Sequence, residues 1–154
     1  MEALAGGLVQ ATSVSLNFSG CRNLTGAAVE ALFGGLAQAT SVRLDFSYCN
    51  LTDAAVEALA GGLAQATNVN LNFTYCNLTT VEALAGGLAQ ATSVSLDFSF
   101  CENLTDAAVK ALASGLGQAT SVSLDFDDCP ELTEKRRAEV AALNRTSGSS
   151  TAIN

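Results

Sequence analysis

Residues 39–49 read ATSVRLDFSYC, and residues 91–101 read ATSVSLDFSFC. The Val-x-Leu-x-Phe core of this stretch occurs five times in the chain, at intervals of 28, 27, 25 and 28 residues. The copies begin at Val14, Val42, Val69, Val94 and Val122. Similarity at a period of roughly 20–50 residues is typical of chains built from stacked copies of one structural unit. The sequence therefore predicts a repeat array.

Each repeat contains the pattern of one strand and one helix. Val42, Leu44 and Phe46 alternate with polar residues, which is the period of a half-buried strand. The next block, residues 51–65, places its apolar residues at helical spacing, and Thr52 is a good N-cap for that helix. Thr25, Thr105 and Thr133 hold the same position in other copies. Because one strand and one helix cannot bury their own apolar edges, we expect the repeats to stack into a solenoid.

The string Leu44-x-Phe46-x-x-Cys49-x-Leu51 resembles the core of the leucine-rich repeat, Leu-x-Leu-x-x-Asn/Cys-x-Leu. The helical second half and the repeat length of 25–28 residues are similar to the ribonuclease-inhibitor-like and cysteine-containing subclasses. The chain departs from the family pattern in two ways. Ser41 replaces the leading Leu, and three copies carry one extra residue between Cys and Leu. Those copies are Cys21 to Leu24, Cys101 to Leu104 and Cys129 to Leu132.

The resemblance implies a fold and a class of function. The implied fold is α/β, a right-handed leucine-rich-repeat horseshoe. Five parallel strands would form its concave face and about six parallel helices its convex face. The implied function is that of a scaffold for binding proteins, with no catalysis of its own.

The repeats cover residues 1–143, which we interpret as a single domain of about five repeats. Its N-terminal end has no polar capping repeat, because residues 1–8 align with residues 56–63 inside a helix block. We expect the charged block 133–143 to form a C-terminal capping helix, and residues 144–154 to form a flexible Ser/Thr-rich tail. A fragment of a longer array and a consensus-designed array stay open as alternatives.

Composition excludes several classes of function. The chain of 154 residues has no His, so a His triad, a His general base and a His-containing zinc site are impossible. The net charge of −8 argues against nucleic acid and against anionic membrane surfaces as partners. No apolar run approaches the roughly 18 residues that span a bilayer, so we expect no membrane insertion. We predict that the protein is not an enzyme and uses no cofactor or metal.

The five cysteines are evenly spread, one in each repeat, at Cys21, Cys49, Cys76, Cys101 and Cys129. A disulfide scaffold would be smaller and denser in Cys. Free Cys is among the most buried residue types, so buried, reduced thiols are favoured over a metal or redox ladder. These thiols, together with an N-terminus that lacks the features of a signal peptide, predict an intracellular location, cytoplasmic or organellar.

Paired small residues recur within the helix blocks, where we expect them to lie in mid-helix and to allow close approach of neighbouring helices. The pairs are Gly6-Gly7, Gly34-Gly35, Gly61-Gly62, Gly86-Gly87 and Ser114-Gly115.

Alternate strand residues are expected to face solvent as three rows across the sheet. The first row is Ser15, Arg43, Asn70, Ser95 and Ser123; the second is Asn17, Asp45, Asn72, Asp97 and Asp125; the third is Ser19, Ser47, Thr74, Ser99 and Asp127. The face becomes acidic toward its C-terminal end, which favours a basic partner. Clustered carboxylates could instead bind Ca²⁺, but they lack EF-hand spacing.

A fourth row follows the strands and consists of Gly20, Tyr48, Tyr75, Phe100 and Asp128. Its three aromatics are the best interface hot spots in the chain, because buried aromatics dominate interface energetics. The alternative is that they stack on one another and cover the loop edge. The candidate partner-binding residues are Tyr48, Tyr75, Phe100, Arg43, Asp45, Asp97, Asp125, Asp127 and Asp128.

The sequence therefore predicts a non-catalytic protein–protein interaction scaffold that binds through the sheet face and the adjoining aromatic edge. The alternative is a structural or accessory subunit that packs end-on, through its N-terminal edge, in a larger assembly.

Overall fold

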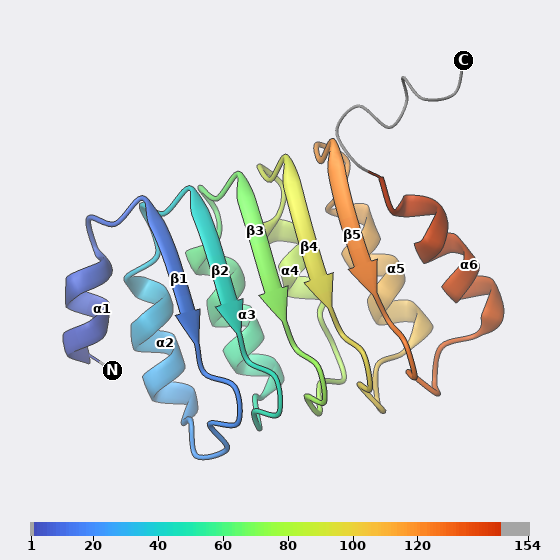
Figure 1. Ribbon diagram of the computed structural model, residues 1–154, viewed down its shortest axis with the longest axis horizontal. Coiled ribbons are helices and arrows are strands. Elements are labelled where there is room, and N and C mark those ends of the chain that lie inside the picture. Colours follow the sequence, from blue (N-terminus) through green and yellow to red (C-terminus); the bar gives the residue numbers. More distant parts are fainter. Residues whose placement is uncertain (1, 146–154) are drawn as a thin grey trace.

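The computed structural model describes residues 2–145, which form one parallel sheet with helices on one side of it (Figure 1). The strands are β1 (Ser13–Asn17), β2 (Ser41–Asp45), β3 (Asn68–Asn72), β4 (Ser93–Asp97) and β5 (Ser121–Asp125), and they pair in that order. The helices are α1 (Glu2–Leu8), α2 (Gly26–Gly34), α3 (Asp53–Gly62), α4 (Glu82–Gly87), α5 (Asp106–Ser114) and α6 (Glu134–Leu143).

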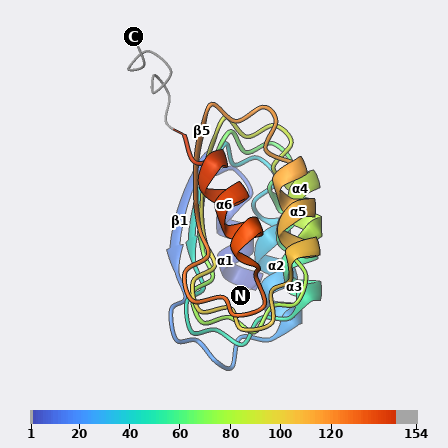
Figure 2. The ribbon, with the colours of Figure 1, turned by 90° about the vertical axis from the view of Figure 1, so that its right-hand side faces the viewer.

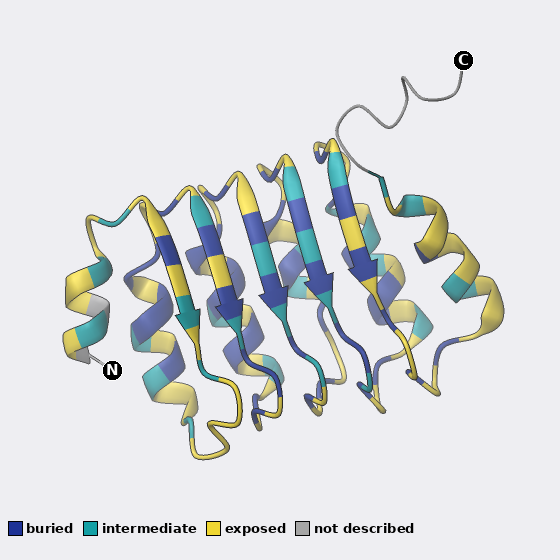
Figure 3. Cartoon of the chain, viewed as in Figure 1, coloured by how far each residue is buried: buried dark blue, intermediate teal, exposed yellow. Residues whose placement is uncertain are grey.

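Equivalent residues of neighbouring repeats pair directly, so the core consists of ladders of identical side chains. Val42 pairs with Val69, and Leu44 pairs with Leu71. Just beyond the strands, five phenylalanine rings stack nearly parallel, with centroids 5.2–6.0 Å apart. They belong to Phe18, Phe46, Phe73, Phe98 and Phe126. Buried residues accordingly alternate with exposed or half-buried ones along the middle strands (Figure 3).

The expected threonine N-caps are confirmed. Thr25, Thr52, Thr105 and Thr133 each accept a hydrogen bond from the backbone N–H three residues on, at 3.2–3.3 Å. The shorter helix α4 begins after Val81 and has no side-chain cap. The Asp53 carboxylate of the preceding repeat accepts from the N–H groups of Thr79 and Thr80 in the loop before α4. Burial opposes ionisation of Asp53, but the bonds from Thr79 and Thr80 outweigh it and lower its pKa.

The paired glycines end the helices rather than lying in mid-helix, so that prediction is wrong in placement. The pairs of α3 and α4 are the last two residues of those helices, and Gly115 is the C-cap of α5. A Cβ on Gly62 would lie 2.6 Å from the carbonyl oxygen of Phe33, whereas one on Gly61 would meet nothing within 4 Å. Close approach of neighbouring helices therefore explains Gly62, Gly87 and Gly115, but not Gly61, Gly86 or Gly7.

The C-terminal end of the array is covered by the chain itself. Helix α6 lies closer to the sheet than α5 does, against β5 (Figure 2). Asn144 and Arg145 then bind the edge of β5, although the sequence placed the start of a flexible tail at Asn144. The remainder of that expected tail, residues 146–154, lies outside the described residues. None of the described helices is long and apolar enough to cross a membrane.

Candidate functional site

The second-row side chains of the sheet face fix the backbone turn that follows each strand. In every repeat the side-chain oxygen of the second-row Asn or Asp accepts a hydrogen bond from the backbone N–H of the residue two positions later, at 2.8–3.0 Å. This bond is an Asx turn, which explains why only Asn and Asp occupy the row. Asp45, Asp97 and Asp125 each commit Oδ1 to this turn. These predicted binding residues therefore also have a structural role, which sequence reasoning missed.

The third row is less exposed than expected. Ser47 and Ser99 are buried, at 6% and 7% exposure, so their assignment to the solvent-facing surface is wrong. The Ser47 hydroxyl bonds Ser19 at 2.8 Å, and the Ser99 hydroxyl donates to Asp125 at 3.0 Å. Small hydroxyl residues here join neighbouring repeats, whereas Asp127 in the last repeat is exposed.

The aromatic row forms a continuous stack. The rings of Tyr48 and Tyr75 lie 4.7 Å apart, and those of Tyr75 and Phe100 lie 4.4 Å apart. Tyr48 and Tyr75 are nevertheless 48% and 47% exposed, while Phe100 is half-buried. The two alternatives for this row are therefore compatible, because the rings stack and still present their edges to solvent.

All five residues of this fourth row adopt a left-handed backbone conformation. The φ angles are 58° at Tyr48, 57° at Tyr75 and 60° at Phe100. Gly20 and Asp128 complete the row at 76° and 52°. Aromatic residues seldom adopt this conformation. It directs each N–H of the row, Asp128 excepted, to a third-row carbonyl of the next repeat at 2.8–3.0 Å.

Two hollows of about 420 Å³ flank the ring of Tyr75. The first is lined by Arg22, Tyr48, Cys49, Asn50, Tyr75 and Asn77. The second is lined by Tyr75, Cys76, Asn77, Phe100, Glu102 and Asn103. The polar residues of these hollows lie in the loops after the aromatic row. The repeat pattern did not single them out.

The charged candidates fall into two groups. Arg43 and Asp45 line a hollow of about 360 Å³ over β1, β2 and β3. At the other end Asp97 pairs in register with Asp125, and the exposed Asp127 and Asp128 follow. Within residues 2–145 no group of His, Cys, Asp or Glu side chains is arranged to hold a metal ion. The structure therefore separates a mixed-charge end of the sheet face from an acidic end.

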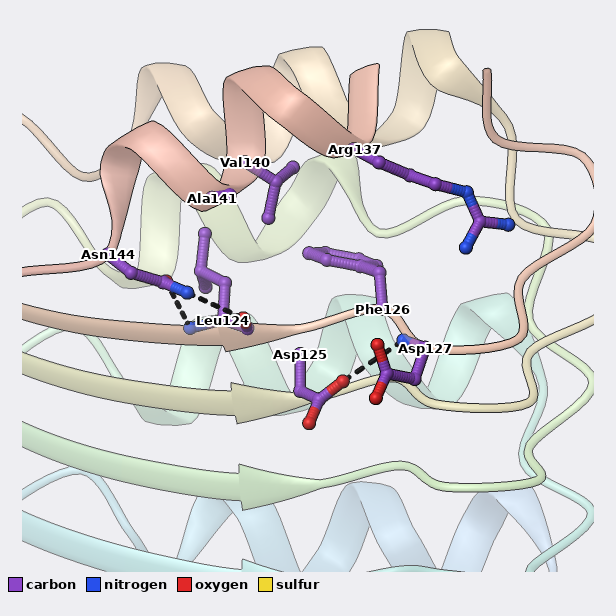
Figure 4. Close-up of a pocket in the computed structure, with 8 residues that line it drawn as sticks. All are labelled: Leu124, Asp125, Phe126, Asp127, Arg137, Val140, Ala141 and Asn144. Carbon is purple, nitrogen blue, oxygen red and sulfur yellow. Dashed lines mark hydrogen bonds between the residues drawn. The ribbon is translucent and has the colours of Figure 1, made fainter. Parts of the chain in front are cut away.

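A cleft of about 300 Å³ adjoins the acidic end, between β5 and α6 (Figure 4). Its lining residues are Leu124, Asp125, Phe126, Asp127, Arg137, Val140, Ala141 and Asn144. The Arg137 guanidinium donates to the carbonyl oxygens of Leu132 and Cys129. Only Asp125 and Asp127 of this cleft were candidates from the sequence. Arg137 and Asn144 reach it because α6 turns back against β5.

A family model described as Leucine Rich repeat matches residues 39–60 and 94–113. The chain has the fold of a leucine-rich-repeat solenoid. A solved structure described as the tropomodulin C-terminal domain of Caenorhabditis elegans is similar, with a TM-score of 0.64 and 13% sequence identity. The match covers 92% of this chain and 89% of that one. None of the curated proteins matches the sequence. These findings confirm the leucine-rich-repeat solenoid, and they do not assign the ribonuclease-inhibitor-like subclass.

In every repeat after the first, the cysteine joins that repeat to the preceding one. The thiols of Cys49, Cys76, Cys101 and Cys129 each donate to the carbonyl oxygen of the preceding repeat's ladder phenylalanine, at 3.0–3.3 Å. All four are buried, as predicted. Cys21 is exposed, so the prediction is wrong there. The physical reason is that no described repeat precedes β1 to supply the carbonyl and the cover.

Thiol reactivity tests this arrangement. Burial raises the pKa of Cys76 and of Cys101 to about 12. At about pH 8 we expect Cys21 to react with a maleimide promptly, and the buried thiols at least about a hundredfold more slowly, because the thiolate is the nucleophile. Mass mapping of the labelled peptides checks this. Cys21→Ser is the control and should leave no fast-reacting thiol, whereas prompt labelling of Cys76 in the native protein would contradict the ladder.

Proposed function

We propose that the protein is a non-catalytic scaffold that binds a protein partner through the sheet face and the aromatic stack. The observation that carries the proposal is the stack of Tyr48, Tyr75 and Phe100, whose tyrosines are about half exposed. Its stacked neighbours already hold each ring in place, so little side-chain entropy is lost on binding. Aromatic anchors of this kind dominate interface energetics.

The charged residues beside the stack supply orientation and selectivity. Asp125, Asp127 and Asp128 give one end of the surface a negative field, which attracts and orients a basic partner. Arg43 and Asp45 at the other end add contacts of both signs. The leucine-rich-repeat architecture supports the proposal by analogy alone, because function resides in the site and not in the fold. We further propose an intracellular location, cytoplasmic or organellar, supported by five free thiols.

Quantitative capture from a lysate tests the surface. Tyr48→Asn/Tyr75→Asn removes both tyrosine rings, and Asn tolerates the left-handed backbone that these positions require. The control, Glu57→Gln, changes an exposed residue of α3 on the opposite side of the molecule. We expect a genuine partner to be captured at least about tenfold less by the tyrosine variant and equally by the control. Equal capture by all three proteins, with the tyrosine variant folded, would overturn the surface assignment.

End-on packing is the second candidate function, and the N-terminal edge favours it. Among residues 2–145, β1 pairs with β2 alone, and Leu16 and Phe18 are half-buried where the equivalent Leu44 and Phe46 are buried. Packing of another molecule on this edge would remove that apolar surface from water. Sedimentation over a hundredfold concentration range tests self-association. A mass that rises with concentration supports it, and a constant mass of 15.7 kDa counts against it.

A further inference from the structure

The same three backbone groups form hydrogen bonds at every junction between repeats. The N–H of the ladder phenylalanine donates to the second-row carbonyl of the next repeat, at 2.7–2.8 Å. The N–H of the fourth-row residue donates to the next third-row carbonyl, at 2.8–3.0 Å. The phenylalanine carbonyl accepts the next cysteine thiol. In the last repeat these groups are the N–H and C=O of Phe126 and the N–H of Asp128, and none has a partner among residues 2–145.

The first half of the same edge is closed by the chain itself. Val122 exchanges two backbone hydrogen bonds with Arg145, at 2.6 and 2.8 Å. The Asn144 side-chain amide imitates a peptide group, donating to the Leu124 carbonyl at 3.1 Å and accepting its N–H at 2.7 Å. This cover runs from Leu124 back toward Val122, so the N–H groups of Phe126 and Asp128 have no partner among residues 2–145. An open strand edge of this kind accepts an added strand.

The cleft beside Phe126 has the size and lining for a short peptide segment. Its volume of about 300 Å³ is at the lower end of ligand-pocket sizes. The Phe126 ring and Val140 face each other between β5 and α6, while the carboxylates of Asp125 and Asp127 lie on the side of the strand that faces away from α6 (Figure 4). An added strand could therefore place one side chain in the cleft and direct the next toward the carboxylates.

The carboxylates at the cleft favour the binding of a positively charged peptide segment. Both hydrogen bonds to Asp125 fall on Oδ1, so its Oδ2 is free to receive a cation. The guanidinium of Arg137 donates to two backbone carbonyls and keeps its positive charge, which offsets one of the two carboxylates that line the cleft. Within the part of the chain that the structure describes, the one ion pair joins Arg136 and Glu139, so none of these carboxylates is ion-paired. Asp125, Asp127 and Asp128 thus present negative charge beside unpaired backbone donors.

We propose that this half-open edge of β5 docks an extended, Lys- or Arg-containing segment of a partner protein. The segment pairs with the N–H groups of Phe126 and Asp128 and sets a basic side chain against Asp125 and Asp127. The inference rests on the proposed function, since it names the chemistry that the acidic end of the same face recognises.

Titration of the isotope-labelled full chain with two designed peptides tests the proposal by NMR. The probe is acetyl-Lys-Val-Arg-Val-Lys-amide, and the control peptide carries Glu at each basic position. We expect the probe to shift the amide signals of Phe126 and Asp128 and to slow their hydrogen exchange at least about threefold, and the acidic peptide to do neither. The amide of Leu124, already bonded to Asn144, should change little.

Asp125→Asn/Asp127→Ser is the decisive variant, because both replacements occur naturally at the same rows of other repeats, as Asn72 and Ser99. We expect it to weaken probe binding at least about tenfold, and Glu57→Gln, which removes an exposed carboxylate from α3, to leave binding unchanged. Shifts spread over the whole sheet face, or unchanged binding by the double variant, would overturn the proposal. That failure is separable from failure of the proposed function, because the tyrosine variant tests capture of a partner independently.

Discussion

Gly87→Ala is expected to lower the free energy of unfolding by about 3 kcal/mol, although it adds a single methyl group. A Cβ at this position would lie 2.6 Å from the carbonyl oxygen of Ala60 and 2.8 Å from its Cα. Both atoms are backbone of α3, so the methyl group can be accommodated only if α3 and α4 move apart. That movement would loosen the ladders on both sides of the junction. Urea denaturation monitored by circular dichroism measures the loss.

Gly86→Ala is the matched control, one residue earlier in the same helix. Its Cβ would meet nothing within 4 Å, so the substitution restricts only the unfolded chain. We expect it to be neutral or to stabilise the protein by up to about 1 kcal/mol. Equal destabilisation by both variants would show that glycine is needed at these positions for its backbone flexibility and not for the close contact between α3 and α4.

Phe73→Ala is expected to destabilise the protein by about 4 kcal/mol. Phe73 is fully buried at the centre of the phenylalanine ladder. Its ring lies 6.0 Å from that of Phe46 and 5.2 Å from that of Phe98. Truncation would remove both stacking contacts and leave a cavity that the rigid strand register cannot close. Urea denaturation again gives the magnitude.

Phe18→Ala is the comparison, because Phe18 ends the ladder at β1 and is half-buried, with a stacking partner, Phe46, on one side. We expect Phe18→Ala to lower the free energy of unfolding by about half as much as Phe73→Ala does, because truncation at a partly exposed site leaves a smaller cavity and removes less buried apolar surface. Equal costs at the two positions would mean that the ladder does not stabilise the chain through stacked neighbours.

The repeat pattern was sufficient to predict the strands, most helices and the alignment of the aromatic row. Val42 and Leu44 identified a strand, and Thr52 identified the start of a helix, because these signals depend on local sequence alone. The left-handed backbone at Tyr48 and Tyr75 could not be predicted from residue type, since aromatics rarely adopt it. At both tyrosines it accompanies a hydrogen bond from the N–H to the next repeat, which forms only when the repeats stack.

The sequence did not predict the closed and open halves of the C-terminal edge. Asn144 and Arg145 looked like the start of a polar tail, since nothing in their own sequence indicates a partner. They bind β5 because α6 ends beside Leu124 and Val122, which is a property of the folded chain. The open edge at Phe126 is equally invisible, because a backbone N–H is present in every residue and only its surroundings leave it unpaired.

The sequence by itself determined the solenoid, its register and the row to which each strand residue belongs. Identical residues at a nearly constant period bury their apolar sides when the copies stack in register, so the repeat alone leads to the ladders. The tertiary structure decided how residues at equivalent positions of different repeats differ in burial and in surroundings. Cys21 is exposed while Cys49 is buried, and Asp125 lines the cleft between β5 and α6 while Asp45 lines a hollow over β1, β2 and β3. Burial, closure and charge at such positions depend on what lies against a repeat, and a repeat at the end of the array has a neighbour on only one side.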